Sequence, residues 1–130
     1  MLVEDDHVDY VTVQRALKET RVSTRLELAS NGEEALAYLH SFDNDRPGII
    51  VLDLNMPRMN GIEFLRILKN DRDLKKIPVV ILTTSRAEQD INDSFNLGAA
   101  GYMVKPVDYQ EFIDAVITID RYWRLSELPE

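Results

Sequence analysis

The stretch IIVLDLNMPRMNG, residues 49–61, decides the fold. It opens with four consecutive apolar residues, which a strand covered on both faces requires, and such strands are typical of parallel sheets. Asp53 follows this run directly, and Pro57 and Gly61 then break the chain before the helical spacing of apolar residues begins at Ile62. The stretch therefore predicts the central strand of a parallel sheet, with an acidic side chain at its carboxyl end.

The rest of the chain repeats this alternation of a short apolar run and a helical pattern. Further strands are expected at residues 1–3, 26–28, 79–82 and 101–104, and the first should begin several residues before Met1. Five such units in series are typical of parallel βα folds. Capping-box spacing places helix starts at Asn31 and Asp108, and Gly98 is a suitable helix end. The pattern predicts one doubly wound α/β domain over residues 1–130.

The composition excludes several classes of function. The formal net charge of -8 repels phosphate backbones, which argues against direct binding of nucleic acid. The absence of cysteine removes disulfides, thiolate chemistry and cysteine-type zinc sites. No apolar run is long enough for a membrane span, and no export signal is seen, so the expected location is the cytoplasm.

Polar and charged side chains collect where the predicted strands end. Asp5, Asp6, Asp53, Thr83 and Lys105 follow the first, third, fourth and fifth strands. Because the carboxyl ends of parallel strands share one edge of the sheet, these residues should converge there.

Carboxylates brought so close together repel one another unless a cation intervenes, and Mg2+ prefers such oxygen ligands. We expect Asp6 and Asp53 to bind Mg2+ directly and Asp5 to bind it through water, with the backbone carbonyl of Asn55 as a further ligand. Asp53 is also the best placed nucleophile toward phosphorus. Lys105 and Thr83 are expected to hold the oxygens of the transferred phosphoryl group.

Taken together, these blocks resemble the receiver domains of bacterial response regulators, of which the chemotaxis protein is the simplest member. The resemblance covers nearly the whole chain and rests on five blocks in one order: Val3-Glu4-Asp5-Asp6; Leu52-Asp53-Leu54-Asn55-Met56-Pro57 with Met59-Asn60-Gly61; Pro78 with Thr83; Gly98-Ala99-Ala100-Gly101-Tyr102; and Lys105-Pro106. It implies a three-layer flavodoxin-like (βα)5 fold with the parallel strand order 2-1-3-4-5.

The resemblance also implies a function in two-component signal transduction. Asp53 would accept a phosphoryl group from a sensor histidine kinase in a Mg2+-dependent reaction, and the chain would catalyse its own phosphorylation and dephosphorylation without being a conventional enzyme. Thr83 and Tyr102 would shift as a coupled switch, and the Lys105–Pro106 peptide bond would be cis.

Two further positions are implied by the resemblance. Asn55 lies two residues beyond Asp53, and Ser85 lies two residues beyond Thr83. In this family, the residues at these two positions affect the rate at which the phosphate is lost.

Within the family, the chain looks most like the stand-alone regulators paired with phytochrome-type kinases. Its apolar end, which holds Tyr122, Trp123, Leu125 and Leu128, is the kind of patch that marks an interface. We therefore hypothesise a homodimer formed through the fourth helix, the fifth strand and the fifth helix.

Three other functions remain open. A Mg2+-dependent phosphohydrolase would need a general acid or base two residues beyond its nucleophile, where this chain has Asn55. A flavin carrier of similar architecture would need a phosphate-binding loop after the first strand, where Asp5 and Asp6 would repel a phosphate. A scaffold that has lost phosphorylation would not need the acidic site.

Overall fold

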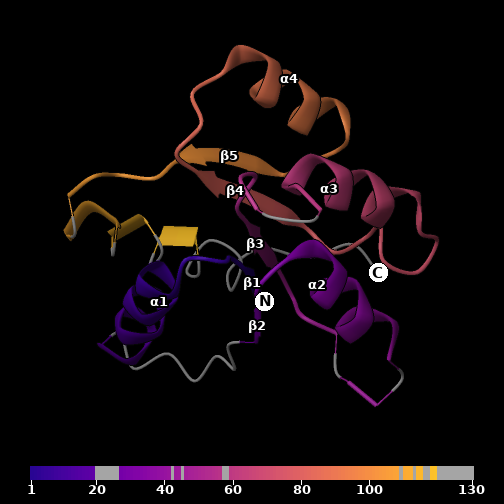
Figure 1. Ribbon diagram of the computed structural model, residues 1–130, viewed down its shortest axis with the longest axis horizontal. Helices are drawn as coiled ribbons and strands as arrows, with labels where there is room; N and C mark the ends of the chain where they lie inside the picture. Colours follow the sequence, from indigo (N-terminus) through magenta and orange to yellow (C-terminus); the bar gives the residue numbers. More distant parts are fainter. Residues whose placement is uncertain are drawn as a thin grey trace.

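The computed structural model describes residues 1–19, 27–41, 43–44, 46–56, 59–108, 110–112, 114–115 and 118–119. Its five strands form one sheet in the order β2-β1-β3-β4-β5, and every neighbouring pair is parallel (Figure 1). The strands are β1 (Leu2–Val3), β2 (Leu28–Ala29), β3 (Ile50–Leu52), β4 (Val79–Thr83) and β5 (Gly101–Val104). The predicted fold class and strand order are confirmed.

Within the part of the chain that the structure describes, four helices are defined: α1 (His7–Glu19), α2 (Gly32–His40), α3 (Gly61–Asn70) and α4 (Glu88–Asn96). Helical residues also occur at 110–112, 114–115 and 118–119. In Figure 1, α2, α3 and α4 lie on one side of the sheet, and α1 lies on the other side with the helical residues after position 109. The molecule therefore has three layers, with the sheet in the middle.

The continuous apolar runs form the central strands because both of their faces are covered. All five residues of β4 are buried, as are Ile50 and Leu52 of β3. Successive side chains of a strand point to opposite faces. Accordingly, Leu2 packs in a cluster with Leu82 and Phe112, whereas its neighbour Val3 belongs to the larger cluster on the other face.

The ends of the helices follow the sequence signals. Asn31 caps α2 by accepting the N–H of Glu34, and Asp108 accepts the N–H of Glu111 in the same way. Gly98, just after α4, has a φ of 96°, a left-handed conformation that glycine adopts without steric cost. These three predicted boundaries are confirmed.

Gly61 positions the loop that follows the central strand. Its N–H donates to the carbonyl of Leu54 at 2.9 Å. A Cβ at this position would lie 2.6 Å from the backbone oxygen of Asp53, which is too close for any side chain. The loop can therefore fold back tightly against the end of β3 only because residue 61 is glycine.

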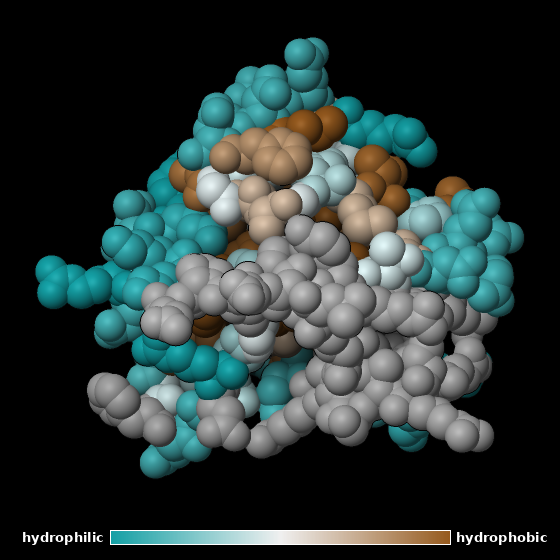
Figure 2. Space-filling model, turned by 180° about the vertical axis from the view of Figure 1, so that it is seen from behind, coloured by the Kyte–Doolittle hydropathy of each residue, from teal (hydrophilic) through white to brown (hydrophobic). Residues whose placement is uncertain are grey.

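The surface of the described part is largely polar. Figure 2 shows the back of the molecule, where apolar residues gather in the upper part, at the height of α4 and β5 in Figure 1. Among the described large apolar side chains, Val8, Ile67, Phe95 and Val107 are exposed. None of the described helices has the length and apolar character needed to cross a membrane.

Candidate functional site

The carboxyl ends of the strands bring the predicted site residues to one edge of the sheet. Lys105 follows β5, and its Nζ lies 3.6 Å from Oδ2 of Asp53, which follows β3. Thr83, the last residue of β4, is fully buried, and its Oγ1 lies 3.5 Å from Nδ2 of Asn55. Asp53, Asn55, Thr83 and Lys105 therefore converge as the sequence indicated.

The acidic group at this edge differs by one residue from the predicted one. Carboxylate oxygens of Glu4, Asp5 and Asp53 all lie within 4.8 Å of one another, with Glu4 and Asp53 buried and Asp5 exposed. Asp6 is outside the group. Its Oδ1 instead accepts the backbone N–H groups of Val8 and Asp9, at 2.9 and 3.3 Å. The role of Asp6 as a direct metal ligand stays a prediction, and the carboxylates that the structure groups at this edge are those of Glu4, Asp5 and Asp53.

The reason for this shift is where the strand ends. The N–H of Glu4 still donates to the carbonyl of Ala29 at 2.9 Å, so the pairing with β2 continues through Glu4. The chain then turns into α1, and Asp6 lies where the first N–H groups of the helix lack partners and attract a carboxylate. Glu4, which was not among the predicted metal ligands, lies at the edge of the sheet where Asp6 was expected. Its position directly after the apolar pair Leu2–Val3 was the available signal.

Lys105 is surrounded by carboxylates. Its Nζ donates to Oε2 of Glu4 at 2.5 Å and to Oδ2 of Asp9 at 2.7 Å, and it lies farther from Asp53. Burial by itself would lower the pKa of Lys105, but the hydrogen bonds to Asp9 and Glu4 and the charge of Asp53 together raise it. The ammonium therefore stays charged and is the positive group of the site.

Burial puts an electrostatic cost on the charged form of Glu4. Its side chain is only 3% exposed, and burial raises its pKa from 4.5 to about 7. The hydrogen bond from Lys105 acts in the opposite direction, whereas the charge of Asp53 raises the pKa further. A carboxylate at this position therefore needs more positive charge than Lys105 alone supplies.

The donor set suits a hard divalent cation. Three carboxylates from two loops offer oxygen ligands close together, one of them at the solvent-exposed side. Such an oxygen-rich, partly open arrangement is what Mg2+ and similar ions prefer. The N–H of Asn55 donates to Oδ1 of Asp53 at 3.3 Å, so Asn55 borders the group. The role of its carbonyl as a ligand stays a prediction.

A hydrogen-bond network connects this edge to α4 and β5. Oγ1 of Thr83 accepts the N–H of Ser85 at 3.4 Å, and the Ser85 hydroxyl donates to Asp90 of α4 at 2.6 Å. The Tyr102 hydroxyl donates to the carbonyl of Ser85 at 2.9 Å. Ser85 thus joins Thr83 to Tyr102, the two residues predicted to move together.

The Lys105–Pro106 peptide bond is not cis, because no cis bond occurs among the described residues, which include both. The N–H of Lys105 donates to the carbonyl of Thr83 at 2.7 Å, so the pairing with β4 continues up to the proline. The Lys105 ammonium reaches the carboxylates from this trans backbone. Since cis and trans differ by only about 0.5–1 kcal/mol before proline, the dipeptide alone could not decide the isomer.

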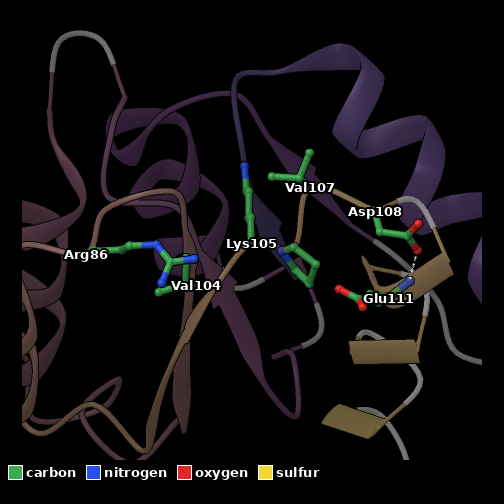
Figure 3. Close-up of a pocket in the computed structure, with 7 residues that line it drawn as sticks. Arg86, Val104, Lys105, Val107, Asp108 and Glu111 are labelled. Carbon is green, nitrogen blue, oxygen red and sulfur yellow. Dashed lines mark hydrogen bonds between the residues drawn. The ribbon is translucent and has the colours of Figure 1, made fainter.

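An open pocket lies beside the acidic edge (Figure 3). Arg86, from the segment between β4 and α4, borders it on one side, and Asp108 and Glu111 border it on the other. Lys105 and the fully exposed Val107 lie between them.

Comparisons with known proteins agree with this geometry. The sequence model of the response regulator receiver domain matches residues 1–117. The chain is 37% identical over 127 residues to the response regulator Rcp1 of Synechocystis sp., covering 95% of this chain and 86% of that protein. It is 35% identical over 105 residues to the chemotaxis protein CheY of Pseudomonas aeruginosa, covering 78% and 82%.

Solved structures give the same result. The Mn2+-bound form of Rcp1 superposes with a TM-score of 0.91 at 36% identity, covering 99% of this chain and 96% of the other. The phosphorylated cyanobacterial phytochrome response regulator RcpA superposes with a TM-score of 0.92 at 37% identity, with the same coverage.

Proposed function

Since the chain belongs to the response regulator receiver domains of two-component systems, we propose that Asp53 is the residue that accepts the phosphoryl group. The observation that carries this proposal is the position of Asp53. It follows the central strand β3, belongs to the acidic group and lies 3.6 Å from the Lys105 ammonium, whereas Glu4 of the same group is already hydrogen-bonded to that ammonium. Its 7% exposure at an open edge still lets an incoming phosphoryl group reach it.

The reaction follows from the groups present. An oxygen of the Asp53 carboxylate attacks phosphorus of a phosphohistidine, the new O–P bond forms, and the P–N bond breaks with its electron pair left on the imidazole. Lys105 offsets the negative charge on the transferred group, and the Thr83 hydroxyl donates a hydrogen bond to it. The chain supplies all three of these groups, so the phosphorylation and the later hydrolysis need no further catalytic protein.

Glu4, Asp5 and Asp53 would hold a divalent cation that supplies further positive charge at the phosphoryl oxygens. Mg2+ is proposed as this ion because it keeps water and phosphate ligands beside a few carboxylates. The Mn2+ in the Rcp1 structure supports a divalent ion in a similar protein.

The output is a shift of the surface around α4 and β5. Thr83, once bonded to a phosphoryl oxygen, pulls on the segment that holds Ser85, and Tyr102 then exchanges its bond to the Ser85 carbonyl for an inward position. This shift moves an existing equilibrium rather than creating a new fold. Asn55 and Ser85 border the reacting groups and would set how long the phosphate persists.

The proposal extends to the partners and the setting of the chain. A phytochrome-type sensor histidine kinase is the proposed donor, because the similar RcpA is a phytochrome response regulator. We infer one receiver domain over residues 1–130 in the cytoplasm. The proposed homodimer would use α4, where Phe95 is 49% exposed, β5 and the predicted fifth helix at the chain end. Tyr122, Trp123, Leu125 and Leu128 of that end lie outside the described residues.

The phosphoacceptor role is tested by labelling with acetyl phosphate and measuring the intact mass. Wild type should gain one phosphoryl group only in the presence of Mg2+, and Asp53→Asn should gain none. Asp73→Asn is a matched control, because it removes an exposed acid between α3 and β4, at the other end of the sheet. Equal labelling of wild type and Asp53→Asn would overturn the assignment.

A phosphohydrolase acting on an outside substrate is the alternative function. It would release phosphate from such a substrate repeatedly, but the position two residues beyond Asp53 holds an amide that cannot serve as a general acid or base. Turnover of a phosphomonoester without a labelled intermediate on Asp53 would favour the alternative.

A further inference from the structure

The Lys105 ammonium is held by two carboxylates other than the proposed phosphoacceptor. It lies 2.5 Å from Glu4 and 2.7 Å from Asp9, whereas the 3.6 Å to Asp53 exceeds hydrogen-bond distance. A lysine ammonium has three protons to donate, and two of them are used by these partners. The group proposed to bind the phosphoryl oxygens is therefore engaged elsewhere before the phosphoryl group arrives.

Asp9 is the unexpected member of this arrangement. It belongs to the first turn of α1 and is not among the grouped acids Glu4, Asp5 and Asp53. Its N–H donates to the cap residue Asp6 at 3.3 Å, which fixes the backbone from which its side chain reaches Lys105. The contact is therefore a consequence of how α1 begins.

The two partners of Lys105 differ in how easily they can release it. Glu4 is 3% exposed, so losing the ammonium would leave a buried charge without compensation. Asp9 is 30% exposed and lies at the positive end of a helix, so water and the helix stabilise it once it is alone. When Lys105 must turn toward Asp53, Asp9 is the partner it can leave at the lower cost.

We propose that Asp9 is a positioning residue that holds Lys105 away from Asp53 and so opposes occupation of the phosphoryl site. The inference rests on the proposed function of Asp53 and Lys105. An anion on Asp53 must break the Asp9–Lys105 bond before the ammonium can bind it. Asp9 thereby lowers the affinity for a phosphoryl group and sets how readily the switch turns on.

Removing the charge of Asp9 should therefore strengthen binding of a phosphoryl analogue. The bond opposes binding with the strength of a partly exposed ion pair, which corresponds to a change of roughly two- to five-fold in affinity. Lys105 would then meet the analogue with two free protons instead of one, and with one carboxylate fewer nearby.

The test measures the dissociation constant of beryllofluoride in saturating Mg2+, by calorimetry on the full chain, together with the rate of labelling by acetyl phosphate. Asp9→Asn should bind beryllofluoride roughly two- to five-fold more tightly than wild type and label faster. Asp9→Glu, which keeps the charge, should return both values toward wild type. Asp9→Ala is a second variant without the charge, to be used if Asp9→Asn folds poorly.

Two controls separate this role from a general effect of charge or structure. Asp108→Asn removes an exposed acid three residues from Lys105 and keeps a helix-capping side chain, so its affinity should match that of wild type. In a Lys105→Met background, Asp9→Asn should change the affinity by less than it does in the native background.

An unchanged dissociation constant in Asp9→Asn, or an equal gain in Asp108→Asn or in the Lys105→Met background, would overturn the role of Asp9. These outcomes leave Asp53 labelling in wild type intact. A wild-type chain that neither labels nor binds beryllofluoride would instead overturn the proposed function, and the role of Asp9 with it.

Discussion

Replacing Glu4 by glutamine should make the metal-free protein more stable at pH 8 and leave its stability at pH 4 nearly unchanged. Glutamine has the shape of the protonated glutamate, and its amide oxygen can still accept a hydrogen bond from Lys105. What it removes is the buried negative charge. The variant therefore tests whether burial or the ion pair with Lys105 dominates at this position.

The pH window follows from the raised pKa of Glu4. In the unfolded chain the carboxyl loses its proton near its ordinary value of 4.5, and in the folded protein near about 7. Between these values the folded state binds the additional proton, so rising pH destabilises it. The loss of folding stability caused by the buried charge of Glu4 is complete above about pH 7 and absent below pH 4.5. A shift of this size corresponds to about 3 kcal/mol, or roughly 10 °C in melting temperature for a chain of this length.

The assay is thermal unfolding by circular dichroism in EDTA at a series of pH values, with Glu34→Gln as the control for an exposed glutamate. The difference between Glu4→Gln and wild type should grow from near zero at pH 4 to its full value at pH 8. Saturating Mg2+ should stabilise wild type more than the variant, which reduces the difference. If Glu4→Gln is less stable than wild type at pH 8, the ion pair outweighs the cost of burial and the reasoning is refuted.

Two further predictions concern packing. Gly61→Ala should lower the free energy of unfolding, measured in urea, by at least about 2 kcal/mol, because the new Cβ would lie 2.6 Å from a backbone oxygen. Gly48→Ala is the control and should have little effect, because no atom lies within 4 Å of the position of its Cβ. Ser94→Ala should stabilise the protein by about 1 kcal/mol, because the buried Ser94 hydroxyl has no hydrogen-bond partner among the described residues. A melting temperature equal to or lower than that of wild type would contradict this expectation.

Much of the fold was predictable because each strand carries its own signal. The apolar runs at 49–52 and 79–82 can form strands only if both faces are covered, and that requirement implies a parallel sheet with helices on both sides. The convergence of Asp53 and Lys105 then follows, since both lie at carboxyl ends of strands in that sheet.

The details that the sequence could not decide depend on where a local element ends. Three consecutive acids follow β1, and which of them faces the edge depends on the residue at which pairing with β2 stops. These three consecutive residues have three different roles. Glu4 binds Lys105, Asp5 lies at the exposed side of the acidic group, and Asp6 caps α1. Asp9 was not foreseen, because its contact with Lys105 depends on the direction in which α1 leaves the sheet.

The same arrangement explains why this edge needs a cation before it can accept an anion. Glu4, Asp9 and Asp53 lie within 3.6 Å of the Lys105 ammonium, and Asp5 is grouped with Glu4 and Asp53. Two like charges about 5 Å apart repel each other by about 3 kcal/mol at the effective dielectric of a protein surface. A phosphoryl group would add to that repulsion while Lys105 is still held by Glu4 and Asp9. Glu4, Asp5 and Asp53 would hold a divalent ion whose charge would weaken the attraction of these acids for Lys105, so that Lys105 could turn to the phosphoryl group. Asp9 is the partner that Lys105 can leave at the lower cost, so the stability of the Asp9–Lys105 ion pair would control the response.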